Sequence, residues 1–507
     1  MKLVYVPLDE RPCNVIFPRM QLPRRGGVIL STPPRDMLGY KKRPARTDLI
    51  AGWLESEIGT ADALILPLEI VLYGGLIPSR IHTLSQEELE RRLTWLHRLV
   101  RRATSNGCRV YLYGMIMRTP AYSSSEEEPD YYAVYGKPLF RRGYLSHKEE
   151  MVGLHPRERA ELAEEVEKIP EDVITDYETR RRLNHSALQR ILEFVAEGLL
   201  ERLILPEDDT APYGYGPREK LSLQRSIEKL QISDRVYSYP GADEVGTLLV
   251  AAAALAATGK RLAVAPVYMD QEASKLTPKY ESQPLSESVR SQIRAMGAVP
   301  VEEPAAADFV LALNCCSEEM GEAWNQKPSD LCALRQVGFM DALHAIADEH
   351  QLMIAMADCA SANGGTTALI EAIERKQLWD DFCGYAGWNT TGNTVGTALA
   401  QGALYRLFGD QETRRDNLVY RLLDDWAYQA VVRQELAQHP NGFDSIALGS
   451  KIQDAREIAR GALNRLWTRT FSGEGLPTSP GLESVDFPWD RLFEIELHLS
   501  PTVTTKE

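Results

Sequence analysis

The feature that most constrains the fold is a series of short, continuously apolar runs that alternate with helix-like stretches. The runs are bounded by turn residues and comprise Leu3–Pro7, Ala63–Pro67, Val110–Met117, Leu203–Pro206, Val236–Tyr239, Leu262–Val267, Phe309–Leu313, Met353–Ala357 and, more weakly, Phe382–Gly387. Strands buried on both faces of a parallel sheet have this continuous pattern, whereas half-exposed strands alternate apolar and polar residues. Between the runs, stretches such as Ser85–Arg102 have apolar residues at helical spacing. The pattern predicts a parallel α/β fold.

The strand–helix repeats are compatible with two architectures. We expect a (β/α)8-barrel-like parallel sheet, with an open doubly wound α/β sheet as the alternative, because both have the same periodicity. The expected domains are a barrel-like catalytic domain over residues 1–400 and a helical C-terminal region over residues 401–507. Residues 119–168 interrupt the repeat with serine, glutamate and tyrosine clusters. We interpret this segment as a long excursion or lid, because structureless connections of such length are uncommon.

Composition narrows the class of protein. The chain has 507 residues, of which 44% are hydrophobic and 25% are charged, so it can form a hydrophobic core. Its net charge of −15 argues against nucleic-acid binding, which normally needs a basic surface. No apolar segment approaches the roughly 18 residues of a membrane span, and charged residues stand where a signal peptide needs its apolar stretch. The seven cysteines form no CxxC pair, which favours reduced thiols. We therefore expect a cytoplasmic protein without nucleic-acid or membrane partners, of undetermined oligomeric state.

Polar residues follow nearly every apolar run. In parallel α/β folds the functional site lies beyond the carboxyl ends of the strands, so these residues are candidates for binding substrate. Loops are polar in any case and short acidic residues often cap helices, which offers a structural explanation for part of the set. The expected substrate-binding residues are Asp9, Arg11, Asn14, Glu69, Arg118, Tyr213, Asp270, Asp358, Asn363, Trp388, Asn389 and Asn393.

The strongest catalytic candidate is the acidic group that follows Leu203–Pro206. Glu207, Asp208 and Asp209 are consecutive, and repulsion and burial would raise the pKa of at least one of them. Glycoside hydrolysis requires one protonated carboxyl and one ionised carboxylate, and tyrosine or tryptophan rings can support a sugar face. We therefore predict a glycoside hydrolase for a small sugar or amino-sugar glycoside, with catalytic carboxyls among Glu207, Asp208, Asp243 and Glu244. A helix cap without a ligand is the structural alternative.

Two other functions stay open. A hydrolase or lyase dependent on Mg²⁺ or Mn²⁺ could use Asp9, Asp208, Asp270 and Asp358, because hard cations take oxygen ligands. A non-catalytic protein that binds a sugar or small acid could retain the same architecture. The nine histidines form no HxH or HExxH pair, which argues against zinc. The leading hypothesis requires no cofactor, and its partner is a small carbohydrate.

A short repeat supports the strand–loop–helix reading. Three segments that begin at Asp243, Asn363 and Asn393 align without gaps, each with a glycine within three residues and a threonine four residues on. We interpret them as recurrent helix starts at one mouth, with Asp or Asn near the N-cap, although chance similarity is an alternative.

Three stretches of the chain are long and distinctive: VPLDERPCN at residues 6–14, Ala357–Gly365 and Gly384–Ala400. They resemble an uncharacterised bacterial family of unknown function, DUF4127, and the similarity extends over almost the whole chain. The resemblance implies no particular activity and supplies no catalytic residues. It does draw attention to the polar residues within those motifs, namely Asp9, Arg11, Asn14, Asp358, Asn363, Trp388, Asn389 and Asn393.

Overall fold

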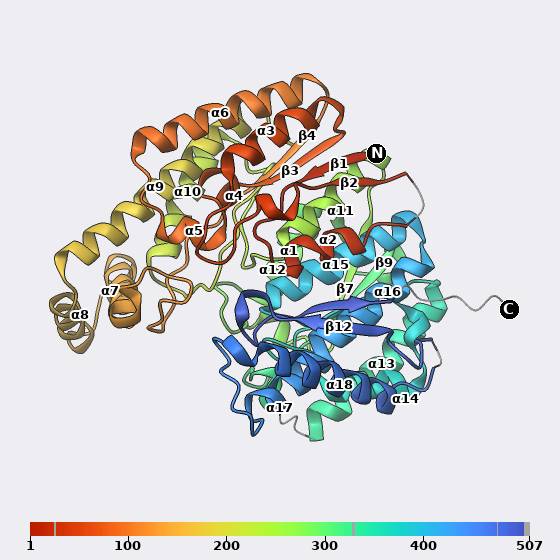
Figure 1. Ribbon diagram of the computed structural model, residues 1–507. Coiled ribbons are helices and arrows are strands. Elements are labelled where there is room, and N and C mark those ends of the chain that lie inside the picture. The colour runs from red at the N-terminus through yellow and green to blue at the C-terminus, as the bar shows by residue number, and fades with distance from the viewer. Residues whose placement is uncertain (25–26, 327–329, 474, 501–507) are drawn as a thin grey trace. The chain divides into compact units, whose positions relative to one another are not determined.

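The computed structural model describes residues 1–24, 27–326, 330–473 and 475–500, which form two compact units (Figure 1). Unit 1 comprises Met1–Glu10, Ile29–Leu249 and Tyr280–Ser282, and unit 2 comprises Arg11–Val28, Val250–Lys279 and Gln283–Glu507. All seven cysteines are free thiols, in agreement with the sequence prediction. In the described part of the chain, no helix has both the length and the apolar character that a membrane crossing requires.

Unit 1 is built on a six-stranded parallel sheet. The strand order is β2-β1-β3-β4-β5-β6, with β1 (Lys2–Tyr5), β2 (Ile29–Ser31), β3 (Ala63–Pro67), β4 (Arg109–Tyr113), β5 (Arg202–Ile204) and β6 (Val236–Tyr237). All five residues of β3 are buried. This burial explains why the central strand shows a continuous apolar run rather than an alternating one.

Unit 1 also contains several helices, and two of them lie within the predicted excursion. The helices are α3 (Thr47–Glu57), α4 (Leu68–Leu72), α5 (Leu76–Ile81), α6 (Gln86–Ser105), α7 (Tyr132–Val152), α8 (Pro156–Lys168), α9 (Glu171–Ala196) and α10 (Tyr215–Leu230), with short 3-10 turns η1 (Arg35–Met37) and η2 (Ile58–Thr60). The helix α11 (Val245–Thr258) begins in unit 1 and ends in unit 2. Residues 119–168 contain α7 and α8, which pack against each other (Figure 1). The helical part of the excursion therefore satisfies most of its backbone hydrogen bonds internally, whereas residues 119–131 are not helical.

Unit 2 contains a five-stranded parallel sheet of order β11-β10-β9-β7-β8. The strands are β7 (Ala263–Tyr268), β8 (Val299–Pro300), β9 (Phe309–Asn314), β10 (Ile354–Asp358) and β11 (Phe382–Ala386). On one face, Val310 and Met356 belong to the core shared with α13 (Asp330–His350), α14 (Thr367–Lys376) and α18 (Ile452–Thr470). On the other face, a Cβ at Gly402 of α15 (Thr391–Phe408) would lie 3.0 Å from the Ala355 Cβ. Both faces of this sheet are covered.

The remaining elements of unit 2 are mostly helical. They are α1 (Pro12–Val15), α2 (Phe17–Met20), η3 (Ala273–Lys275), α12 (Leu285–Met296), η4 (Pro304–Ala306), η5 (Ala323–Asn325), η6 (Trp379–Asp381), α16 (Gln411–Arg421), the π-helix η7 (Leu422–Val432), α17 (Arg433–Ala437), η8 (Gly449–Lys451) and η9 (Pro488–Asp490). The strands β12 (Leu482–Asp486) and β13 (Glu496–Leu499) form an antiparallel pair.

The predicted α/β class with parallel sheets is confirmed, but the predicted closed barrel is not what the described strands form. They divide into two parallel sheets, and β6 and β7 belong to different sheets. The expected boundary at residue 400 also differs from the division at Leu249/Val250. The physical reason is packing: side chains of α16, η7 and α18 belong to the same core as β9 and β10, so residues 401–499 complete unit 2.

Candidate functional site

The carboxyl ends of five strands bring charged residues to one edge of the unit 1 sheet. Pairing continues past β5, because the Glu207 backbone N–H donates to the Tyr239 carbonyl at 3.0 Å and Gly241 N–H donates to the Glu207 carbonyl at 3.1 Å. The residues that follow the strands here are Asp9, Glu69, Arg118, Glu207, Asp208, Asp209, Asp243 and Glu244. Within this unit, several of the predicted carboxylates therefore follow strands of one sheet.

Two buried arginines organise the charges at this edge. Arg80 lies on α5 and Arg118 follows β4, and their side chains are 3% and 7% exposed. Both donate to the Glu127 carboxylate, Arg80 at 3.1 Å and Arg118 at 2.8 Å. Arg118 Nε also donates to Glu128 Oε1 at 2.8 Å. A guanidinium suits this role, because its planar fork can serve several carboxylates at once.

Asp208 and Asp209 complete the network. Arg80 Nη2 donates to Asp208 Oδ2 at 2.6 Å, and Arg118 Nη1 donates to Asp209 Oδ2 at 2.7 Å. Burial and the neighbouring charge of Asp208 raise the pKa of Asp209 to about 6. Two guanidiniums thus face four carboxyls, those of Asp208, Asp209, Glu127 and Glu128. A proton on Asp209 reduces the surplus negative charge.

Asp209 also has an unusual backbone conformation. Its φ is 37°, in the left-handed region that non-glycine residues rarely adopt. Strained residues of this kind concentrate at functional sites, where the surrounding structure maintains them. The Asp208–Asp209 pair lines a hollow of about 360 Å³ whose other walls include Phe140, Tyr213 and Tyr215. Paired carboxyls and aromatic rings therefore share one concave surface.

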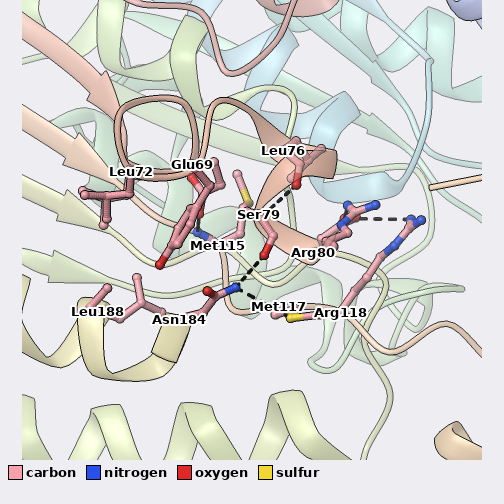
Figure 2. Close-up of a pocket in the computed structure, with 14 residues that line it drawn as sticks. Glu69, Leu72, Leu76, Ser79, Arg80, Met115, Met117, Arg118, Asn184 and Leu188 are labelled. Carbon is pink, nitrogen blue, oxygen red and sulfur yellow. Dashed lines mark hydrogen bonds and ion pairs between the residues drawn. The ribbon is translucent and has the colours of Figure 1, made fainter. Parts of the chain in front are cut away.

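A second hollow of about 390 Å³ adjoins the same arginines (Figure 2). Figure 2 shows Glu69, Met115, Ser79 and Asn184 around it, with Arg80 and Arg118 at one end. Met115 N–H donates to Glu69 Oε1 at 2.7 Å, whereas Glu69 Oε2 has no hydrogen-bond partner among the described residues. Burial raises the pKa of Glu69 to about 7. The carboxyl is therefore divided between its protonated and ionised forms near neutrality.

The other predicted catalytic carboxyls have different surroundings. Glu207 forms an ion pair with Lys220, and the Ser282 hydroxyl donates to its Oε2 at 3.1 Å. Glu244 is 1% exposed and accepts from the Ala242 N–H at 2.8 Å, and burial raises its pKa to about 8. Asp243 is also buried. Glu207 is thus paired with Lys220, whereas Glu244 Oε1 has no hydrogen-bond partner among the described residues. The catalytic roles of these residues remain predictions, and of the predicted set Glu207 and Asp208 line the hollow that contains Asp209.

The predicted binding residues divide between the two units. Asp9, Glu69, Arg118 and Tyr213 belong to unit 1, and the rest belong to unit 2, namely Arg11, Asn14, Asp270, Asp358, Asn363, Trp388, Asn389 and Asn393. The sugar-binding roles expected for the residues of both groups remain predictions.

Two of the unit 2 carboxylates are engaged in contacts that hold the fold together. Asp358 is completely buried and accepts hydrogen bonds from Asn314, from the Thr366 N–H and hydroxyl, and from Tyr385, at 2.6 to 3.0 Å. It thereby joins the end of β10 to its neighbours. Asp270 accepts from Arg335 Nη1 at 2.9 Å.

The predicted helix starts differ in detail. Asp243 lies in unit 1, whereas Asn363 and Asn393 lie in unit 2, so the three segments do not end strands of one sheet. Asn393 lies inside the first turn of α15, and its Nδ2 donates to the Thr390 hydroxyl at 3.0 Å. In the Asp243 segment the predicted glycine contact is present, because a Cβ at Gly246 would lie 3.0 Å from the Tyr5 Cζ.

The sequence prediction did not include several residues of this site, namely Arg80, Glu127, Glu128 and Phe140. Asp209 was recognised as part of the acidic group but was not among the predicted catalytic carboxyls. The run of glutamates in the excursion was visible, but nothing in the sequence indicates that it returns to the strand ends. The burial of Arg80 could not be recognised either, because α5 has only six residues and is too short to show a helical pattern of apolar residues. Burial of a charge requires a partner, which is the physical reason why these residues occur together.

No metal centre is apparent in the part of the chain that the structure describes, where no group of three or more His, Cys, Asp or Glu side chains is arranged to hold an ion. Of the four aspartates considered for Mg²⁺ or Mn²⁺, Asp9 and Asp208 belong to unit 1, and Asp270 and Asp358 to unit 2. The donors around Asp358 already occupy both of its oxygens.

Comparison with known proteins identifies the family. A family model described as a protein of unknown function, DUF4127, matches residues 3–498. The chain belongs to the DUF4127 family. No curated protein matches it. A solved structure of a Bacteroidetes-affiliated GH5 cellulase, linked with a polysaccharide utilization locus, shares 11% identity with this DUF4127 chain at a TM-score of 0.18, covering 74% of this chain and 88% of that one. A likeness at that level says nothing about the chemistry of this chain.

Proposed function

We propose that unit 1 hydrolyses a small glycoside, with Asp209 as the proton donor and Asp208 as the catalytic carboxylate. The observation that supports this assignment is the contrast within the pair. Arg80 balances the charge of Asp208 at 2.6 Å, while burial and Asp208 together raise the pKa of Asp209 to about 6. Glycoside hydrolysis uses two carboxyls in these two protonation states.

In this mechanism the Asp209 proton moves to the glycosidic oxygen as the bond to the anomeric carbon breaks. Asp208 stabilises the positive charge that develops on that carbon. Tyr213 and Phe140, which line the same hollow, provide aromatic surface for the sugar. Water then adds to the anomeric carbon and restores the proton to Asp209.

An N-acetylated amino sugar suits adjacent carboxyls best. Its acetamido oxygen can attack the anomeric carbon, and this substrate-assisted route needs one carboxylate to accept the amide N–H and a neighbouring acid for the leaving oxygen. Asp208 and Asp209 are consecutive and line one hollow, which supports this assignment of the two roles. No cofactor takes part in the proposed steps, and the partner is a small carbohydrate.

The test is turnover of nitrophenyl glycosides by the full chain, with N-acetylglucosaminide and glucoside compared. We expect activity on the acetamido sugar and a fall of about 100-fold or more in kcat with Asp208→Asn or Asp209→Asn. Asp234→Asn, at an exposed aspartate of unit 1, is the matched control and should retain activity. Hydrolysis that survives both site variants would refute the assignment, as would thermal stabilisation by a sugar without any product, which indicates a binding protein.

A further inference from the structure

A third hollow, of about 200 Å³, is lined only by residues of unit 2, and none of them takes part in the proposed hydrolysis. Four separate segments meet there: the N-terminal motif, the loop after β11, the π-helix η7 and the segment before β13. The N-terminal motif contributes Pro12, Cys13 and Phe17, and the loop after β11 contributes Trp388. The π-helix contributes Asp424, and the segment before β13 contributes Glu494. Two of the motifs that are distinctive in the sequence therefore meet around one cavity.

The π-helix places two consecutive aspartates in the interior. Asp424 is 4% exposed and Asp425 is fully buried. Asp425 is engaged, because Arg421 Nη2 donates to it at 2.6 Å and the Gly387 N–H donates at 2.7 Å. Asp424 lines the hollow instead. π-helices are rare and occur frequently at functional sites, so a structural role alone does not account for this arrangement.

The two carboxyls of the hollow are in different electrostatic states. Arg491 donates to Glu494 through Nε at 2.7 Å and Nη2 at 2.6 Å, and Arg11 Nη1 lies 3.4 Å from the same carboxylate. The charge of Glu494 is therefore balanced. Asp424 is faced by Asp425, Glu494 and Arg421, and it forms a side-chain hydrogen bond with Gln429. Burial, followed by the charge of Asp425, raises the pKa of Asp424 well above the usual range, although Arg421 and Gln429 oppose the shift. The protonated form of Asp424 is therefore favoured.

Trp388 gives an independent indication that the hollow holds a ligand. Its side chain is 5% exposed, and its indole N–H has no hydrogen-bond partner among the described residues. Burying an unsatisfied donor is costly, and a ligand oxygen would remove that cost. The indole ring also offers the aromatic face that attracts organic cations most strongly.

We propose that this hollow binds a small hydroxylated primary amine, with its ammonium group beside Asp424 and Glu494 and its oxygen accepting from Trp388 Nε1. Carboxyls combined with aromatic rings form the usual lining of sites for organic cations. The binding step is balanced: the Asp424 carboxylic acid and the ammonium ion give an ion pair plus one proton released to solvent. The hollow is small, so ethanolamine, one of the smallest hydroxylated primary amines, is the appropriate probe.

An anionic ligand is the opposite possibility, because a protonated Asp424 and the indole N–H are both donors. The experiment is titration calorimetry of the full chain with ethanolamine and with glycolate, which has similar size and the opposite charge. Measurements in phosphate and in MOPS, whose heats of ionisation differ, count the protons released. We expect ethanolamine to bind with close to one proton released, and glycolate not to bind.

Variants separate the proposed site from a structural cluster. Asp424→Asn should weaken ethanolamine binding by roughly 30-fold or more and abolish proton release. Trp388→Phe keeps a ring but removes the N–H, and it should weaken binding about fivefold while proton release persists. Asp341→Asn, at an exposed aspartate paired with Lys376, is the matched control. The unfolding midpoint of each variant reports folding. Binding of glycolate, no ethanolamine binding at millimolar concentration, or binding insensitive to Asp424→Asn would overturn the proposal.

Discussion

Arg80 and Asp208 are 128 positions apart in the sequence, yet Arg80 Nη2 donates to Asp208 Oδ2 at 2.6 Å. Arg80 also donates to Glu127, so a single buried guanidinium connects α5, the excursion and the end of β5. This contact fixes the carboxylate that we place at the anomeric carbon. It also makes the stability of unit 1 and the geometry of the proposed site depend on the same side chain.

Replacing Arg80 should destabilise the protein strongly. Arg80→Gln leaves Glu127, Glu128 and Asp208 with an unbalanced charge in a buried setting, and we expect the free energy of unfolding to fall by about 3–5 kcal/mol. Urea denaturation measures this quantity. Arg91→Gln, which removes an exposed arginine paired with Glu88, should change it by less than about 0.5 kcal/mol. Equal losses in the two variants would contradict the buried network.

The proposed acid should control the pH dependence of turnover. Because the pKa of Asp209 is raised to about 6, the proton donor is present below this pH and is lost above it. The value of kcat/KM should therefore fall about tenfold per pH unit above 6. Asp209→Asn should remove this limb and should affect dinitrophenyl glycosides least, because their leaving groups need little protonation. A profile that is unchanged in the variant would exclude Asp209 as the acid.

Glu69 should make the protein less stable at alkaline pH. Its pKa of about 7 in the folded state lies above the usual value, so the folded state holds the proton more tightly than the unfolded chain. The resulting stabilisation is complete at low pH and is lost as the pH rises through 7. Glu69→Gln cannot ionise, and it should be more stable than the parent at pH 8.5 by about 2–3 kcal/mol but not at pH 4. Chemical denaturation at the two pH values tests this sign, and a variant that gains nothing at pH 8.5 would refute it.

The contact between α11 and β1 should not tolerate a methyl group. A Cβ at Gly246 would lie 3.0 Å from the Tyr5 Cζ, so Gly246→Ala should cost about 1–3 kcal/mol through overpacking. Tyr5→Phe removes the hydroxyl beside this position, and the double variant should recover part of the loss in a double-mutant cycle. Gly52→Ala, at an α3 position where a Cβ meets nothing within 4 Å, should instead stabilise by about 0.5–1 kcal/mol. A cost at Gly246 that Tyr5→Phe leaves unaltered would assign the effect to another neighbour.

Strand positions were predictable because burial on two faces leaves a mark in the sequence. Each of the nine apolar runs overlaps a strand of a parallel sheet, and the run Ala63–Pro67 coincides with β3. Two strands of the parallel sheets were missed, β2 and β8, which have three and two residues, too few to show a pattern. The antiparallel pair of β12 and β13 was missed as well, and it lies in the C-terminal region that was expected to be helical. Whether strands close into one barrel or divide into two sheets depends on which edges pair, and periodicity does not encode that choice.

The candidate site was predictable only in part. Asp208 follows a strand, and its position at the sheet edge is a consequence of parallel topology. The partners of Asp208 come from a short helix and from an excursion, and their return to the strand end depends on tertiary contacts. Asp424 was missed for a similar reason, because a π-helix differs from an α-helix in its hydrogen bonding and not in its sequence pattern.

The chain passes from one compact unit to the other five times, and this has a consequence for biosynthesis. Phe17 is made almost at once, but the core that it enters includes residues from Val310 to Leu497. At about 5–20 residues per second, the ribosome needs tens of seconds to deliver them. Cys13 and Phe17 therefore cannot complete their packing until the end of synthesis. A gene fragment that starts at residue 250 would yield a second half without α1 and α2.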